Sequence, residues 1–164
     1  MVEGLNLHKA GGARTAAVTP LSELAAAGDA GPHAQAVRLD VARTPLARLW
    51  RGAPVPRHVV LRGGHVVTRV PASWDLATPE DLAPFRAVVA DLCAAMAGAR
   101  PDVGYCQGMD YVAAMCLRGA AFDVALAHKL LNCLLDDLHL GHIIDMPFRT
   151  LIALLNVAST VPTL

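Results

Sequence analysis

The chain has 164 residues, of which 54% are hydrophobic and 17% are charged. This composition excludes an intrinsically disordered chain and predicts one ordered domain, or a piece of one, that can bury a substantial core. The formal net charge of +0 removes the usual electrostatic reason for nonspecific binding to nucleic acid or to an anionic membrane.

The start of the chain and its cysteines bear on the cellular compartment. Residues 1–18 are rich in glycine and alanine without helical periodicity, and we expect a flexible N-terminal segment there, without a signal-peptide core. No uninterrupted apolar run in the sequence reaches membrane-spanning length. The four cysteines show no Cys-x-x-Cys spacing, which favours buried reduced thiols over a disulfide framework. We therefore expect a cytosolic protein without an integral membrane segment.

A short helix is predicted at the start of the ordered domain, which we place at residues 19–164. In the stretch Thr19-Pro20-Leu21-Ser22-Glu23, Thr19 is the expected N-cap and the proline takes the first helical position. Gly28 is the expected end of this helix.

A second helix is predicted from about His33 to Asp40. The pair Thr44-Pro45 ends it, because a residue before proline is pushed out of the α region. This helix would deliver Arg43 just past its C-terminal end.

The span from Trp50 to Trp74 has a different character, being rich in proline, glycine and arginine. Two short β-branched runs, His58-Val59-Val60-Leu61 and His65-Val66-Val67, flank a Gly63-Gly64 pair. The pair fits either a hairpin turn or an open loop. We interpret residues 50–74 as a loop insertion that carries at most one short β-hairpin.

A long helix is predicted to begin at Thr78-Pro79-Glu80-Asp81, which has the pattern of a capping box. Pro84 is expected inside its first turn, and Gly98 and Pro101 end it. Apolar residues recur along it at spacings of three and four, which places them on one face. They are Leu82, Phe85, Val88, Val89, Leu92, Cys93 and Met96.

Three further helices are predicted downstream. The first begins near Gln107 or Gly108 and packs through Met109, Val112, Ala113 and Cys116. The second has the broadest apolar face of the chain, formed by Phe122, Leu126, Leu130, Leu134 and Leu138, with Leu131 and Leu135 alongside. The last begins at about Pro147 and offers Phe148, Leu151, Ile152, Leu154 and Leu155. The predicted fold is thus an all-α, irregular helical array.

Two separated segments carry side chains suited to phosphoryl transfer, Arg43 in the first and Gln107 in the second. An arginine supplied in trans stabilises the charge that develops on the γ-phosphoryl oxygens of GTP, and a glutamine orients the attacking water. The guanidinium can grip phosphate oxygens with a planar fork, whereas the amide donates and accepts hydrogen bonds without adding charge. The pair predicts a chain that completes the phosphoryl-transfer site of another protein.

These segments resemble the signature of TBC-domain Rab GTPase-activating proteins. The family's first motif, aliphatic-x-x-Asp-x-x-Arg, is matched by Val37, Asp40 and Arg43. The second motif, Tyr-x-Gln extended by Gly-Met, is matched by Tyr105, Gln107, Gly108 and Met109. The resemblance covers roughly residues 34–164, or the first half of such a domain, and fits poorly at 50–74. Asp110 stands where the family commonly has asparagine.

The resemblance implies a role for each matched residue. Arg43 would be the arginine finger and Gln107 the glutamine finger, which replaces the glutamine of the GTPase itself. Asp40 would orient the arginine loop, and Tyr105 would shape the contact surface. Gly108 and Met109 would support the glutamine motif at the partner-binding face.

The resemblance also implies the partner, a Rab-family small GTPase in its GTP-bound form. GTP and Mg²⁺ belong to that partner, so no cofactor or metal is expected in this chain, and no reaction independent of the partner. The expected location is the cytoplasm, with peripheral association with endomembranes through the GTPase as a further possibility. The competing hypothesis is a truncated or degenerate TBC-like module that binds a GTPase or a scaffold without accelerating hydrolysis.

Other readings of single residues are open. Arg43 is also suited to complement a helix dipole, and Gln107 to satisfy a free N–H at a helix start. Cys106 near a helix N-terminus is a candidate nucleophile, but no histidine lies close to it in sequence. A metal site at His139 and His142 with Asp136 or Asp137 is disfavoured, because no thiolate or third histidine completes the set.

Overall fold

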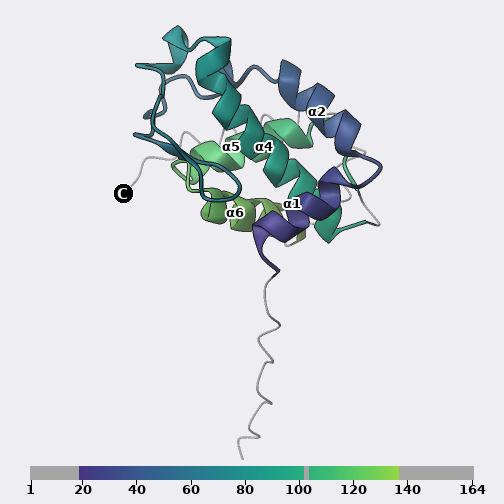
Figure 1. The fold of residues 1–164 in the computed structure, drawn as a ribbon. Helices are drawn as coiled ribbons and strands as arrows, with labels where there is room; N and C mark the ends of the chain where they lie inside the picture. The colour runs from purple at the N-terminus through teal and green to yellow at the C-terminus, as the bar shows by residue number, and fades with distance from the viewer. Residues whose placement is uncertain (1–18, 102–103, 137–164) are drawn as a thin grey trace, which may run out of the picture.

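The computed structural model describes residues 19–101 and 104–136 of the chain (Figure 1). These residues form an all-α fold with one short β-hairpin, as the sequence predicts. The helices are α1 (Leu21–Asp29), α2 (Ala34–Arg43), α3 (Leu46–Leu49), the 3-10 helix η1 (Trp74–Leu76), α4 (Pro79–Ala99), α5 (Met109–Gly119) and α6 (Val124–Asp136). The strands β1 (Val59–Val60) and β2 (Val66–Val67) pair antiparallel, with Val59 opposite Val67. The helix predicted from Pro147 lies outside the described residues.

Helix α4 begins with the predicted capping box. The Thr78 hydroxyl accepts from the backbone N–H of Asp81 at 3.2 Å, and the Asp81 carboxylate accepts from the N–H of Thr78 at 3.1 Å. Two of the unpaired donors at the helix start are thereby satisfied. The prediction for Pro84 was wrong by one turn, since α4 begins at Pro79 and Pro84 lies in its second turn.

The prediction for helix α1 was wrong at both ends. The N-cap is Pro20, not Thr19, and no side chain caps this helix. Gly28 does not end the helix but lies buried within it, because α1 continues to Asp29. The glycine serves tertiary packing: a Cβ at residue 28 would lie 1.9 Å from the carbonyl oxygen of Ala94 in α4.

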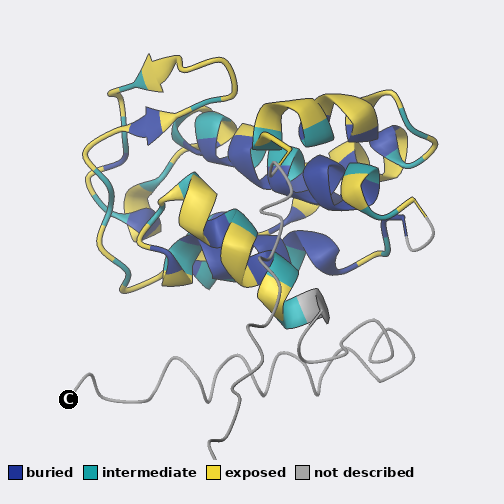
Figure 2. Ribbon diagram, turned by 90° about the horizontal axis from the view of Figure 1, so that it is seen from below, coloured by how far each residue is buried: buried dark blue, intermediate teal, exposed yellow. Residues whose placement is uncertain are grey.

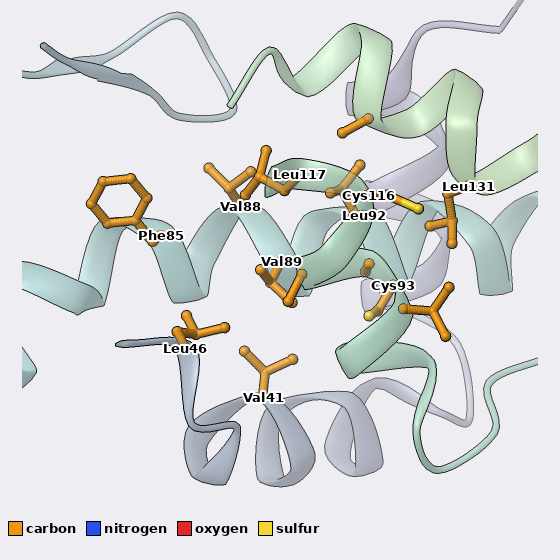
Figure 3. Packing of buried hydrophobic residues seen from close by; sticks show 14 of the residues in the cluster. Val41, Leu46, Phe85, Val88, Val89, Leu92, Cys93, Cys116, Leu117 and Leu131 are labelled. Carbon is orange, nitrogen blue, oxygen red and sulfur yellow. The ribbon is translucent and has the colours of Figure 1, made fainter. Parts of the chain in front are cut away.

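Helix α4 runs through the middle of the molecule, and α1 crosses its C-terminal half (Figure 1). Its buried side chains meet Val41 of α2 and Leu46 of α3 on one side, and Leu117 of α5 and Leu131 of α6 on the other (Figure 3). Buried residues lie on the facing sides of the helices and exposed residues on the outside (Figure 2). Helix α4 thus contacts α1, α2, α3, α5 and α6 and supports them all.

Helix α4 is also the one helix, among the described residues, that is long and apolar enough to cross a membrane by length and composition. More than half of its most apolar window is buried inside the molecule. The same length and composition are found in the central helix of a soluble core, so this feature is weak evidence for a membrane span.

The span 50–74 is attached to the core at both ends. Trp50 and Trp74 are 0% and 2% exposed and their ring centroids lie 4.9 Å apart. Phe85 of α4 and Phe122 complete a cluster of edge-on and stacked rings with centroids 4.9–5.9 Å apart. The hairpin of β1 and β2 projects between these two anchors.

Helix α5 buries the four predicted residues Met109, Val112, Ala113 and Cys116. It ends in a Schellman motif, in which the N–H of Phe122 donates to the Leu117 carbonyl at 2.8 Å. The motif places Ala121 in the left-handed region, with φ of 50°.

The predicted apolar face of α6 is confirmed for Phe122, Leu131 and Leu134 and wrong for Leu126 and Leu130. Ala127 and Leu131 are its buried residues, with Leu134 packed against the core, whereas Leu126 and Leu130 are 45% and 37% exposed. Phe122 precedes the helix and has φ of 66°. Because this residue lies outside the helix, its burial does not fix which face of α6 turns toward the core, and that face is the one that carries Ala127 and Leu131.

Candidate functional site

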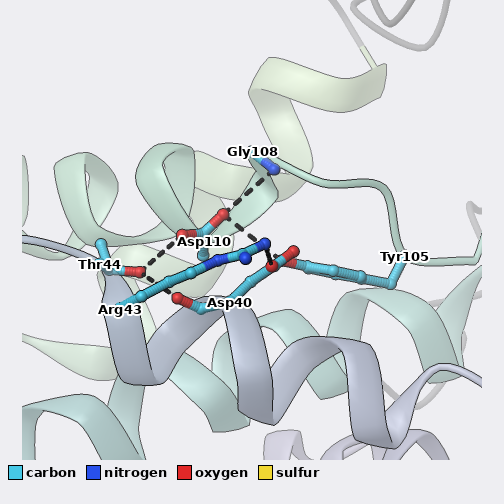
Figure 4. Close-up of polar contacts among 6 residues, drawn as sticks. All are labelled: Asp40, Arg43, Thr44, Tyr105, Gly108 and Asp110. Carbon is cyan, nitrogen blue, oxygen red and sulfur yellow. Dashed lines mark hydrogen bonds and ion pairs between the residues drawn. The ribbon is translucent and has the colours of Figure 1, made fainter.

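Arg43 is the last residue of α2, because the helix continues three residues beyond the predicted end at Asp40. The helix ends there because Thr44, which precedes Pro45, has an extended backbone with φ of −60° and ψ of 126°. The Arg43 side chain is 66% exposed and forms an ion pair with Asp40, one turn earlier on the same helix (Figure 4).

Gln107 lies in the turn directly before α5, and its side chain is exposed. The turn depends on Gly108, the N-cap of α5, whose φ of 100° is strained for any residue with a Cβ. This backbone conformation turns the chain from the loop into the helix and leaves Gln107 at the surface.

Tyr105 links the two segments. Its side chain is buried, and its hydroxyl donates to Oδ2 of Asp40 at 2.9 Å (Figure 4). Burial raises the pKa of the Tyr105 hydroxyl far above its ordinary value, and the negative charge of Asp110 adds to this effect. Tyr105 therefore keeps its proton and acts as a hydrogen-bond donor to Asp40, which in turn holds Arg43.

Asp110 points inward and is 2% exposed. Its Oδ2 accepts from the Thr44 hydroxyl at 2.6 Å, and its Oδ1 accepts from the backbone N–H of Gly108 at 3.1 Å. The carboxylate also lies in the first turn of α5, where the helix dipole favours negative charge. The buried charge is thus held by donors from both sequence motifs.

Arg86 of α4 binds the C-terminal end of α2 through its side chain. Its guanidinium donates to the carbonyl oxygens of Val41 at 2.5 Å and Thr44 at 2.9 Å. Burial lowers the pKa of Arg86, although not enough to remove its charge near neutral pH. Sequence reasoning missed this residue, since an arginine on an apolar helix face carries no motif.

Arg43 and Gln107 line the same open cleft, which has a volume of about 510 Å³. The other lining residues are Asp40, Gly108, Asp110 and Tyr111. The structure therefore brings together the exposed arginine and the exposed amide at one edge of the molecule.

Met109 is placed differently from the other motif residues. It is 8% exposed, belongs to the hydrophobic core, and its Sδ accepts from the N–H of Cys106 at 3.1 Å. Its position suits it to shape the loop from inside rather than to contact a partner.

The described residues contain no group of three or more His, Cys, Asp or Glu side chains that could hold a metal ion. The side chains of the disfavoured metal site, at residues 136, 137, 139 and 142, lie outside what the structure describes. Comparison with protein-family models, with curated proteins and with solved structures found no match for this chain. A functional assignment therefore depends on the motif resemblance and on the geometry of the cleft.

Proposed function

We propose that this chain is a GTPase-activating protein for a Rab-family small GTPase. The observation that supports the proposal most directly is the position of Arg43, at the end of α2, and Gln107, in the turn before α5, as two exposed residues on one open cleft. In this proposal Arg43 is the arginine finger and Gln107 the glutamine finger. GTP and Mg²⁺ are supplied by the partner.

The proposed mechanism depends on the negative charge that develops during GTP hydrolysis. As the γ-phosphoryl group leaves, negative charge spreads over its oxygens, and the Arg43 guanidinium stabilises it at short range. Asp40 keeps that guanidinium at the edge of the cleft before the GTPase arrives, because one of its oxygens pairs with Arg43. The Gln107 amide accepts from the attacking water and donates to a phosphate oxygen, which orients the water for in-line attack.

The Arg43–Asp40 ion pair also supports the second candidate, a GTPase-binding module without catalytic activity. If the guanidinium stayed on Asp40 in the complex, the chain would bind a GTPase without supplying a finger. Both candidates bind the GTPase, but only the activator accelerates GTP hydrolysis. Measuring binding and hydrolysis in parallel therefore distinguishes them.

The test is a panel of GTP-loaded Rab GTPases, assayed for phosphate release and in parallel for binding to this chain. A working arginine finger contributes about 10³ to 10⁵ in rate, so Arg43→Ala should abolish nearly all stimulation. Arg51→Ala is the matched control, because Arg51 is an exposed arginine of similar accessibility that pairs with Asp75 at 2.7 Å. Stimulation by Arg43→Ala equal to that of the parent would exclude the finger role. Binding without turnover would select the module.

A further inference from the structure

The residues that directly follow the two proposed fingers are joined through one carboxylate. Thr44 follows Arg43, and Gly108 follows Gln107. The Thr44 hydroxyl and the Gly108 N–H both donate to Asp110, at 2.6 Å and 3.1 Å (Figure 4). The bond between Thr44 and Asp110 connects positions 66 residues apart in the sequence.

We infer that Asp110 is a positioning residue that fixes the separation between Arg43 and Gln107 by holding Thr44 and Gly108. The inference rests on the proposed function as far as catalysis is concerned. The geometry itself, a carboxylate that bridges the end of α2 and the start of α5, does not depend on it.

Burial gives this bridge its strength. Thr44 is 0% exposed and Asp110 is 2% exposed, so water cannot replace a lost donor without movement of the backbone. An unpaired buried carboxylate oxygen is far more costly than an unpaired neutral group. Removal of the Thr44 hydroxyl should therefore move the backbone at the end of α2 or at the start of α5, and the cavity left by the hydroxyl should not keep its shape.

The hydroxyl of Thr44 has one proton and two neighbouring acceptors. Its Oγ1 lies 2.6 Å from Oδ2 of Asp110 and 3.0 Å from the carbonyl oxygen of Asp40. In the parent the proton goes to the carboxylate. An asparagine at position 110 would keep the bridge, but the hydrogen bond to Thr44 would reverse its direction. The asparagine amide N–H would donate to Oγ1 of Thr44, and the Thr44 hydroxyl would then donate to the Asp40 carbonyl oxygen.

This alternative defines two pairs of variants. Thr44→Val keeps the volume of threonine and removes the hydroxyl, whereas Thr44→Ser keeps the hydroxyl. Asp110→Ala removes the bridge, whereas Asp110→Asn preserves it without the charge. Helical content and the thermal midpoint are measured for all four, and rates are expressed per folded molecule.

The first readout is stimulated GTP hydrolysis. A misplacement of about 1 Å costs up to about 100-fold in rate, so Thr44→Val and Asp110→Ala should lower kcat by about ten- to 100-fold, with little change in KM. Thr44→Ser and Asp110→Asn should stay within about threefold of the parent, since their bridges are intact. In an Arg43→Ala background, Thr44→Val should have a smaller effect than in the parent, because only Gln107 is then left to be misplaced.

The second readout needs no GTPase. Hydrogen exchange of the Gly108 amide should accelerate about fivefold or more in Asp110→Ala and stay near the parent rate in Asp110→Asn, because the amide loses its acceptor only in the alanine variant. If the parent stimulated no GTPase but the variants showed this exchange pattern, the proposed function would be wrong. The structural role of Asp110 as a bridge between Thr44 and Gly108 would still hold.

Two results would overturn the inference. One is parental kcat in folded Thr44→Val and Asp110→Ala. The other is Gly108 exchange that is the same in Asp110→Ala as in Asp110→Asn.

Discussion

Gly28 of α1 lies against the backbone of Ala94 in α4, so closely that a Cβ at residue 28 would come within 1.9 Å of the Ala94 carbonyl oxygen. Gly98 makes the converse approach, since its Cβ would lie 2.4 Å from the carbonyl oxygen of Leu24. Two glycines thus let two helix backbones meet where side chains would normally separate them.

The first prediction concerns this contact. Gly28→Ala should lower the free energy of unfolding by about 3 kcal/mol or more, because the added methyl meets backbone atoms that cannot move aside. Urea unfolding followed by the fluorescence of Trp50 and Trp74 measures the change. Gly119→Ala is the control: a Cβ there meets nothing within 4 Å, and its stability should equal or slightly exceed that of the parent. Equal stability of the two variants would contradict the close packing of α1 on α4.

The second prediction concerns the end of α5. Ala121 has φ of 50° at the position of the Schellman motif that glycine usually occupies. Ala121→Gly should raise the free energy of unfolding by up to about 1 kcal/mol, because glycine tolerates the left-handed region without a Cβ clash. Ala87→Gly, at an exposed position in the interior of α4, should lower it by about 1 kcal/mol. A loss of stability in Ala121→Gly would show that the left-handed conformation is not strained.

The third prediction concerns Asp91 on α4. Burial raises the pKa of its carboxyl group, opposed by Arg62 at 3.6 Å and reinforced by Asp29. A carboxyl group with a raised pKa binds its proton more tightly in the folded state, so folding loses stability as pH rises from the ordinary value of 3.8 through the folded value. Asp91→Asn should therefore have a higher thermal midpoint than the parent at pH 7, and the difference should shrink as pH falls below 3.8.

Thermal unfolding between acid and neutral pH tests this prediction. The control is Asp75→Asn, because Asp75 is 57% exposed in its pair with Arg51 and exposed pairs contribute little. A lower midpoint of Asp91→Asn at pH 7 would mean that the contact with Arg62 outweighs burial.

The fourth prediction concerns thiol reactivity. Burial raises the pKa of Cys116 to about 12, and burial also raises that of Cys93 well above its usual range, with Asp110 adding to the effect. Both thiols should stay unreactive toward a disulfide reagent at pH 8, whereas the exposed Cys133 should react readily. Peptide mapping after labelling identifies the sites, and labelling in denaturant should reach all four cysteines. Labelling of Cys93 in the native protein would contradict this prediction, because it would show that the core around this thiol opens to solvent.

Local sequence patterns predicted the parts of the fold that depend on neighbours in the chain. The capping box at Thr78 and Asp81 was confirmed, and of the two alternatives for the Gly63-Gly64 pair, a hairpin turn or an open loop, the structure has the hairpin turn. Each is set by backbone groups within a few residues, so periodicity and turn chemistry contain the necessary information.

The features that sequence reasoning missed depend on contacts across the fold. The sequence predicts a helix end at Gly28, because the close approach of α4 that requires a glycine there has no local signature. Contacts between distant segments also explain why the candidate site was predicted only in part. The motifs located Arg43 and Gln107, but no pattern indicated that the Thr44 hydroxyl would reach the Asp110 carboxylate or that Arg86 would bind the end of α2.

The anchoring of α2 by Arg86 has a mechanical consequence. Because the half-buried guanidinium of Arg86 holds the carbonyl oxygens of Val41 and Thr44, the main chain on both sides of Arg43 is held in place independently of the Arg43 side chain. The exposed guanidinium of Arg43 can leave Asp40 for an incoming anion while the last turn of the helix keeps its shape. Only the long, flexible part of one side chain has to be reordered at that moment, which keeps the entropic cost of engagement small.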